Sequence, residues 1–170
     1  HGASISEEQR VKGKRPYLLP DFQNAGFNFR MSDIQASLGV SQMGRADDIL
    51  KQRKRIVNKY NEAFKNIGWL KLPECPSEYE HSYQSYVCLF QPKELSYYNV
   101  TSFAEMRNDF MDYLKMNGIT TRPGTHAVHT LHYYMQKYNL EPLDYLNSFI
   151  ADKCSVAFPV YASMTDEEQD

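Results

Sequence analysis

The apolar residues of this chain repeat most regularly at helical spacing, and the longest such repeat begins near residue 31. Its members are Met31, Ile34, Leu38, Ile49, Ile56, Tyr60 and Phe64. A stripe with this period predicts an amphipathic helix, here running from Ser32 to about Lys65. Gly39 and Gly44 weaken its interior and allow a bend near the middle. Because such a helix exceeds the typical globular length, we expect it to bridge two bodies rather than lie on one core.

The pattern changes after Gly68, where short apolar runs replace the long stripe. Strands are predicted at 70–72, 81–90, 119–121 and 155–160. Pro159 favours an edge or terminal position for the last of them. Helices are predicted between the strands, one capped by Thr101 or Ser102 and ended by Asn117-Gly118, and two more over 129–138 and 143–153. The fold class is therefore α/β, more narrowly an α+β small domain of about three to four strands with flanking helices.

The pattern also divides the chain in two. Residues 1–65 combine a turn-rich connecting loop with the long linking helix, and they are predicted to be the end of a larger domain. Residues 66–170 are predicted to form a small C-terminal domain. The stretch from Thr165 to Asp170 is typical of the first turn of a helix with nothing after it. We therefore expect the last helix to be cut and the chain to be a piece of a longer protein.

The start of the long helix carries a capping box. Ser32 and Gln35 are spaced so that the serine hydroxyl accepts from an amide one turn into the helix, while the glutamine side chain reaches back. Asn28 and Arg30 come just before this cap. A helix start leaves N–H groups unpaired and a partial positive charge, so these side chains suit an anion, most simply a phosphate. From these residues alone, the plainer alternative is favoured: Arg30 pairs with a surface carboxylate and Asn28 shapes the turn.

Charge and composition narrow the class of protein. A formal net charge of −2 argues against a general nucleic-acid binder, which normally presents a net basic field. No apolar run approaches the length of a membrane span. The cysteines Cys75, Cys88 and Cys154 are odd in number and widely spaced, so neither a zinc site nor a disulfide framework is predicted. A reducing, cytoplasmic setting is the simplest expectation.

Candidate chemistry is sparse. His126, His129 and His132 form an H-x-x-H-x-x-H run, but the outer two lie roughly 120° apart on an ideal helix, so no metal site is predicted. His129 is better interpreted as a lone polar group in a cleft, near Arg122. The sequence contains no GxSxG, GxGxxG, P-loop or HExxH motif. The residues therefore predict an anion site and little machinery for making bonds.

Several motifs together resemble a known family. The stretch GFNFRMSDIQASLGVSQM begins at Gly26, and it is preceded by His1-Gly2. RKRIVNKY, GITTRPGTHAVH and AFPVYASMTDEE follow in order from Arg53, Gly118 and Ala157. In this order they resemble the DegT/DnrJ/EryC1/StrS family of pyridoxal-phosphate-dependent sugar aminotransferases. The "R-P-G-T-H" segment departs from the "H-Y-x-P" variant found elsewhere in that family, which leaves the substrate open.

The resemblance implies the C-terminal part of a fold-type I enzyme that is cytoplasmic and homodimeric, with active sites shared between subunits. Such enzymes move an amino group, usually from glutamate, onto the keto group of a nucleotide-linked sugar. The lysine that bonds to pyridoxal phosphate would lie upstream, so this chain is expected to hold no catalytic residue and to be inactive alone. A sugar dehydratase of the same fold and a non-catalytic dimerisation or regulatory module are the alternatives.

The resemblance also implies roles for four residues. Asn28 matches the asparagine that reaches the cofactor phosphate of the other subunit, and Arg30 occupies the neighbouring basic position. His129 matches a position on the substrate side of the cleft, and Arg122 belongs to the same motif. We therefore expect Asn28 and Arg30 to bind cofactor, and His129 and Arg122 to bind substrate.

Overall fold

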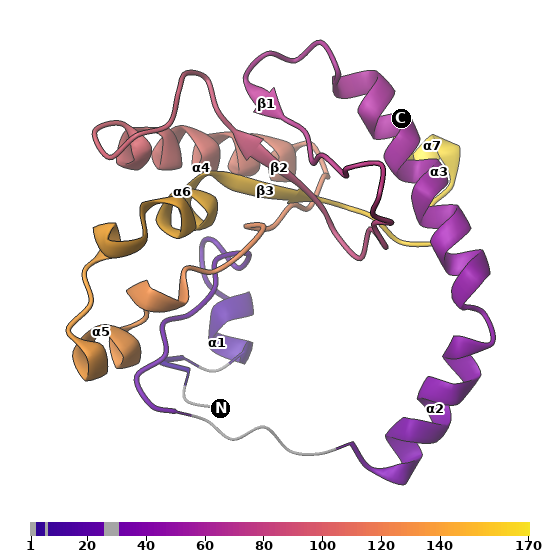
Figure 1. Ribbon diagram of the computed structural model, residues 1–170, viewed down its shortest axis with the longest axis horizontal. Coiled ribbons are helices and arrows are strands. Elements are labelled where there is room, and N and C mark those ends of the chain that lie inside the picture. Colours follow the sequence, from indigo (N-terminus) through magenta and orange to yellow (C-terminus); the bar gives the residue numbers. More distant parts are fainter. Residues whose placement is uncertain (1–2, 6, 26–30) are drawn as a thin grey trace.

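The chain folds into helices around one small sheet (Figure 1). The computed structural model describes residues 3–5, 7–25 and 31–170, so Asn28 and Arg30 lie outside the described residues. In chain order, the elements are α1 (Glu7–Val11), α2 (Asp33–Met43), α3 (Ala46–Phe64), β1 (Leu70–Lys71), β2 (Tyr86–Phe90), α4 (Val100–Met116), the 3-10 turn η1 (Val128–Thr130), α5 (His132–Tyr138), the 3-10 turn η2 (Pro142–Tyr145), α6 (Leu146–Cys154), β3 (Ser155–Phe158) and α7 (Asp166–Gln169).

The sheet has three antiparallel strands in the order β1-β2-β3. The predicted α+β class is confirmed, and β3 lies at an edge as Pro159 indicates. The predicted strand at 119–121 is wrong, because only Arg122 forms an isolated bridge, with Ala157. The predicted strand at 81–90 is shortened to β2. Its first part turns instead, with Tyr83 at φ 47° and its N–H donating to His81 Nδ1 at 2.8 Å.

The predicted single helix from Ser32 to Lys65 is two helices, broken at Gly44 and Arg45. The bend expected at Gly44 is therefore a full interruption, and Arg45 precedes α3 with φ −114° and ψ 6°, outside helical geometry. The capping box at the start of α2 is confirmed. The Gln35 N–H donates to Ser32 Oγ at 3.4 Å, and the Ser32 N–H donates to Gln35 Oε1 at 2.9 Å.

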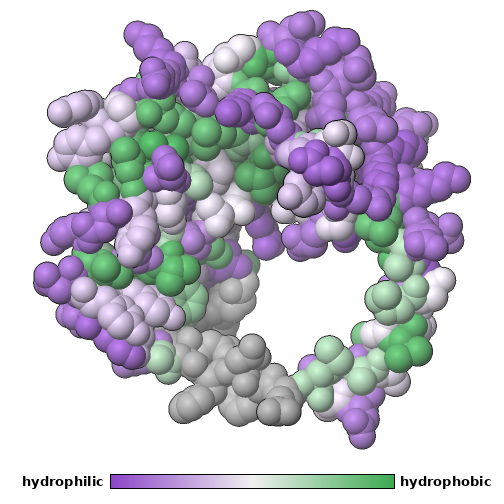
Figure 2. Space-filling view, in the orientation of Figure 1, coloured by the Kyte–Doolittle hydropathy of each residue, from purple (hydrophilic) through white to green (hydrophobic). Residues whose placement is uncertain are grey.

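The two helices differ sharply in burial. On α3, Ile56 and Val57 are fully buried against the sheet residues Tyr86 and Cys88. By contrast α2 has no buried residue, and Ile34 remains 83% exposed. Figure 1 shows α2 standing apart from the sheet, and Figure 2 shows hydrophobic patches on its surface. The apolar stripe predicted from the sequence is therefore divided between two helices, one exposed and one packed against the sheet.

The remaining helices follow the predicted ranges with local changes. The helix α4 begins at Val100 rather than after a cap at Thr101 or Ser102, because the Asn99 side chain folds the preceding loop by accepting from the Ser96 N–H at 2.8 Å. It ends as predicted, at Asn117 followed by a Gly118 with φ +83°. The predicted helices at 129–138 and 143–153 each begin with a 3-10 turn. No helix in the described part of the chain is both long and apolar enough to cross a bilayer.

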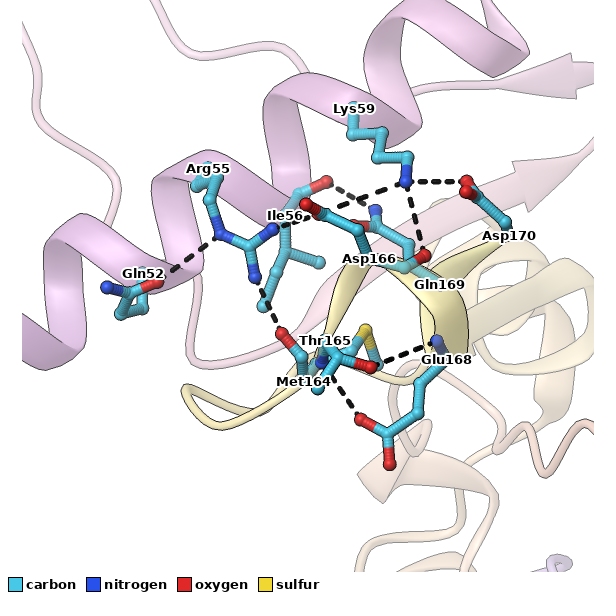
Figure 3. A network of polar contacts seen from close by, with 10 residues as sticks. All are labelled: Gln52, Arg55, Ile56, Lys59, Met164, Thr165, Asp166, Glu168, Gln169 and Asp170. Atoms are coloured by element: carbon cyan, nitrogen blue, oxygen red, sulfur yellow. Dashed lines mark hydrogen bonds and ion pairs between the residues drawn. The ribbon is translucent and has the colours of Figure 1, made fainter.

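Polar contacts tie α7 to α3 (Figure 3). Thr165 caps α7 with a capping box, which confirms a helix start at this position. Arg55 forms an ion pair with Asp166, Lys59 Nζ lies 2.5 Å from an Asp170 oxygen, and Gln169 Nε2 donates to the Ile56 carbonyl at 2.8 Å. The ion pairs are exposed and contribute little to stability individually. Together with the cap, they fix where α7 starts relative to α3.

Candidate functional site

The predicted substrate residues belong to a loop that follows α4 and is pinned to β3. The Arg122 N–H donates to the Ala157 carbonyl at 3.2 Å, and the Ala157 N–H donates back at 2.7 Å. Two residues on, the Gly124 N–H donates to Ser155 Oγ at 2.9 Å. A Cβ on Gly124 would lie 2.2 Å from Val87 Cγ1, so only glycine fits this close approach.

The side chain of Arg122 is exposed and borders a cavity of about 200 Å³. Arg10 and Lys115 border the same cavity, so three cationic side chains surround it. On its wall, the Tyr17 hydroxyl donates to Asp112 at 2.6 Å. Burial and this hydrogen bond raise the pKa of Tyr17 to about 12, so the phenol stays neutral at physiological pH. The cavity therefore carries a positive rim.

His129 is buried and is held on two sides. Its Nε2 lies 2.9 Å from the Pro142 carbonyl, and since a carbonyl only accepts, this nitrogen carries the hydrogen. Its ring packs edge-to-face on Tyr145, with centroids 5.1 Å apart. His129 also borders an open cavity of about 360 Å³, shared with His126 and Tyr134. His129 thus links η1 to η2 at the border of that cavity.

Arg122 and His129 line separate cavities, so the structure does not bring the two predicted substrate residues into one. His126, which lies between them in the sequence, borders the cavity of His129 and another cavity beside α6. His126 and His129 do not form a metal centre with His132, and no cluster of three possible metal ligands occurs among the residues that the structure describes.

His126 contacts a buried carboxylate that the sequence did not single out. Its Nδ1 lies 3.5 Å from Asp152 Oδ1, and Lys153 Nζ lies 3.2 Å from Asp152 Oδ2. Burial pushes the pKa of the Asp152 carboxyl upward, but the contacts with His126 and Lys153 outweigh it, so the pKa lies below its ordinary value. Asp152 is therefore ionised at neutral pH, with a partner on each oxygen.

Arg107 on α4 was also missed. Its side chain is 3% exposed, Nη1 donates to the Ser155 carbonyl at 3.1 Å, and burial lowers the pKa of the guanidinium. The sequence does hold a signal for it, because Arg107 falls at helical spacing between Phe103 and Phe110 in the apolar stripe of α4. A cation within such a stripe indicates a buried charge with a specific task.

Comparisons with known proteins show matches over the whole chain. The model of the DegT/DnrJ/EryC1/StrS aminotransferase family matches residues 1–170. The spore coat polysaccharide biosynthesis protein SpsC of Bacillus subtilis is 26% identical over 170 residues, which cover 100% of this chain and 42% of SpsC. GDP-perosamine synthase of Escherichia coli O157:H7 is 30% identical over 119 residues, which cover 69% of this chain and 29% of that enzyme.

Solved structures share the fold. Spr1654 from Streptococcus pneumoniae, in its PLP form, superposes with a TM-score of 0.70 at 22% identity, covering 98% of this chain and 42% of that one. Spr1654 has also been solved in a PMP form. The chain spans about two fifths of the length of the first curated relatives that it matches, 41% and 42%.

Proposed function

The chain belongs to the DegT/DnrJ/EryC1/StrS aminotransferase family, and from that premise we propose that it is the C-terminal part of a pyridoxal-phosphate-dependent sugar aminotransferase. The observation that carries the proposal is the family match over all 170 residues. In the whole protein, the reaction moves an amino group, with glutamate as donor, onto a keto group of a nucleotide-linked sugar. The three cysteines, unpaired in the structure, agree with a cytoplasmic setting.

The start of α2 is suited to an anion such as the cofactor phosphate. The first turn of α2 is exposed, and its capping box satisfies the N–H groups of Ser32 and Gln35 internally, which leaves those of Asp33 and Ile34 for an anion. Asn28 and Arg30, which precede this turn, would hold the cofactor phosphate, in the subunit opposite to the one that bonds the cofactor. When bound, pyridoxal phosphate supplies the electron sink for amino transfer.

Arg122 and His129 would serve the substrate. A nucleotide-linked sugar is an extended ligand, so two side chains on separate cavities can contact different parts of it. The exposed Arg122 guanidinium would donate to the ligand directly. His129, whose Nε2 is engaged by Pro142, would form part of the wall of the cleft.

Replacing Asn28 with alanine in the full-length protein should weaken retention of the cofactor. Loss of one hydrogen bond to a charged phosphate costs about 2 kcal/mol, or roughly thirtyfold in affinity. The measurement is the cofactor absorbance that remains after dialysis. Asn24→Ala is the matched control, since Asn24 is an exposed asparagine nearby outside the motif position. Equal cofactor affinity in the Asn28 variant and its parent would remove Asn28 from the site.

The upstream residue that meets the cofactor decides between the alternatives. A lysine there, with cofactor absorbance and amino transfer from glutamate, supports the aminotransferase. A histidine there supports the dehydratase. If the position holds neither a lysine nor a histidine, a dimerisation or regulatory module is supported. Residues 1–170 alone should not transaminate, because the nucleophile that holds the cofactor would be absent.

We further propose that the full-length protein is a homodimer with α2 at the subunit interface. Ile34 and Leu38 lie one turn apart on α2 and are 83% and 63% exposed, and Met31, just before the helix, is 69% exposed. Exposed apolar side chains gathered on one helix favour a contact with another surface (Figure 2). This position would also bring Asn28, just before α2, towards a neighbouring subunit.

The double change Ile34→Lys with Leu38→Lys should weaken dimerisation of the full-length protein at least about tenfold, because two charges would enter an apolar interface. Sedimentation at a series of concentrations measures the effect. The control is Gln52→Lys with Asn58→Lys, which adds the same charge at exposed positions of α3. A double variant that stays dimeric but loses stability would instead place α2 against its own subunit.

A further inference from the structure

The segment that follows α1 lies against α4. Tyr17 is buried in a cluster with Met111 of that helix. Asp112, the next residue on α4, accepts hydrogen bonds from the Arg15 Nε–H at 3.1 Å and from the Tyr17 hydroxyl at 2.6 Å. We refer to residues 15–22 as the strap. Its first half is therefore fixed to α4 by an apolar contact and by a carboxylate with two donors.

The second half of the strap reaches the start of α5. The His132 N–H donates to Asp21 Oδ1 at 2.9 Å, and the Tyr133 N–H donates to the Phe22 carbonyl at 3.0 Å. The first N–H groups of a helix have no acceptor within the helix, and Leu131, which precedes α5, provides no side-chain cap. The strap therefore caps α5, with a carboxylate that lies 111 positions earlier in the chain.

The capped start of α5 lies next to the turn that carries His129. His129 belongs to η1, and only Leu131 separates η1 from α5. The ring of His129 is held at Nε2 by the Pro142 carbonyl in η2. The Phe22 ring packs edge-to-face on His126, with centroids 6.3 Å apart, and His126 borders the same cavity as His129. The turn is thus held through η2 at the His129 ring and through the strap at the backbone that follows.

We propose that Asp21 is a positioning residue for the substrate cleft, because its cap on α5 fixes the turn that carries His129. The proposal rests on the substrate role proposed for His129. Asp21 is not among the described residues that line the His129 cavity, so it acts through α5 and not by contact with the ligand. The Phe22 N–H donates to the same Asp21 oxygen at 2.8 Å, which holds the carboxylate in place for this task.

Asp21→Ala in the full-length protein removes the acceptor of the His132 N–H and tests the proposal. Loss of this hydrogen bond should accelerate amide hydrogen exchange at the start of α5 about fivefold, measured by mass spectrometry on fragments that cover 128–138. Asp21→Asn keeps an acceptor oxygen and should restore exchange to within about twofold of the parent. Asp47→Ala is the matched control, since it removes an exposed carboxylate from the first turn of α3, and it should leave exchange at α5 unchanged.

Steady-state kinetics provide the second measurement, with a GDP-linked and a UDP-linked 4-keto-6-deoxyhexose as amino acceptors. Asp21→Ala should raise the KM for the keto sugar that the parent uses about fivefold, because the turn of His129 is no longer fixed. The KM for glutamate should stay within about twofold of the parent, since the smaller donor does not extend along the cleft. Asp21→Asn should restore the KM for the sugar, which a general loss of stability would not explain.

Unchanged exchange in Asp21→Ala would overturn the proposal, because the strap would then not hold α5. Faster exchange with an unchanged KM for the sugar would also overturn it, since the turn of His129 would not depend on the cap. If the parent aminates neither sugar, the proposed function is wrong and not the strap. In that case faster exchange across η1 in Asp21→Ala still supports the role of Asp21 in holding His129, and unchanged exchange there overturns it.

Discussion

Replacing Gly124 with alanine is expected to lower the free energy of unfolding by about 3 kcal/mol, near the upper end of the cost of overpacking. The new Cβ would lie 2.2 Å from Val87 Cγ1, and 2.9 and 3.0 Å from the Ser155 Oγ and Cβ atoms. Val87 is β-branched and belongs to the central strand β2, so its χ1 angle is restricted and its methyl group cannot easily move aside. The loop must therefore move away from β3, which would also break the Gly124 N–H bond to Ser155.

Urea unfolding followed by circular dichroism measures this change. Gly39→Ala is the matched control, because a Cβ at Gly39 meets nothing within 4 Å and alanine favours the helix α2. It should be neutral or stabilising by about 0.5–1 kcal/mol. If Gly124→Ala were as mild as Gly39→Ala, the loop that carries Arg122 and His126 would not be pinned as the structure has it.

How far the sequence predicts the fold depends on whether a signal is local. The cap at Ser32, the helix start at Thr165 and the helix stop at Gly118 were predicted correctly, because each depends on residues within one turn. The strand predicted at 119–121 was wrong, because an apolar run only becomes a strand when a neighbour pairs with it. In the structure β3 pairs fully with β2, and its only backbone bridge to the described part of the loop is at Arg122.

The site shows the same limit. Arg122 and His129 were grouped because they stand in one motif, yet the turn at Gly124 separates them into different cavities. Asp152 could not be linked to His126 from sequence, because the contact joins residues 26 positions apart that meet only in the folded chain. The burial of Arg107 could have been predicted from the sequence, since a cation in an apolar helix stripe is unusual. That its Nε–H lacks an acceptor, however, depends on where α6 and the loop lie in the folded chain.

Replacing Ile56 with alanine should lower the free energy of unfolding by about 3–4 kcal/mol. Ile56 is 0% exposed and packs in the cluster that joins α3 to the sheet, with Tyr86, Cys88 and Met164. Its carbonyl accepts from Gln169, so the same turn of α3 also anchors α7. A cavity here would loosen both contacts, and denaturant unfolding should show it as a lower midpoint at an unchanged slope.

The matched control is Ile34→Ala, the same chemical change at another position of the same sequence stripe. Ile34 is 83% exposed, so its loss removes almost no packing, and alanine is the better helix former. The change should therefore lie within about 0.5 kcal/mol of zero in this chain. The stripe alone assigns both isoleucines to one continuous helix with one buried face. Equal destabilisation by the two substitutions would support one continuous helix, whereas a large difference supports the break at Gly44 and a surface on α2 that none of the described residues covers.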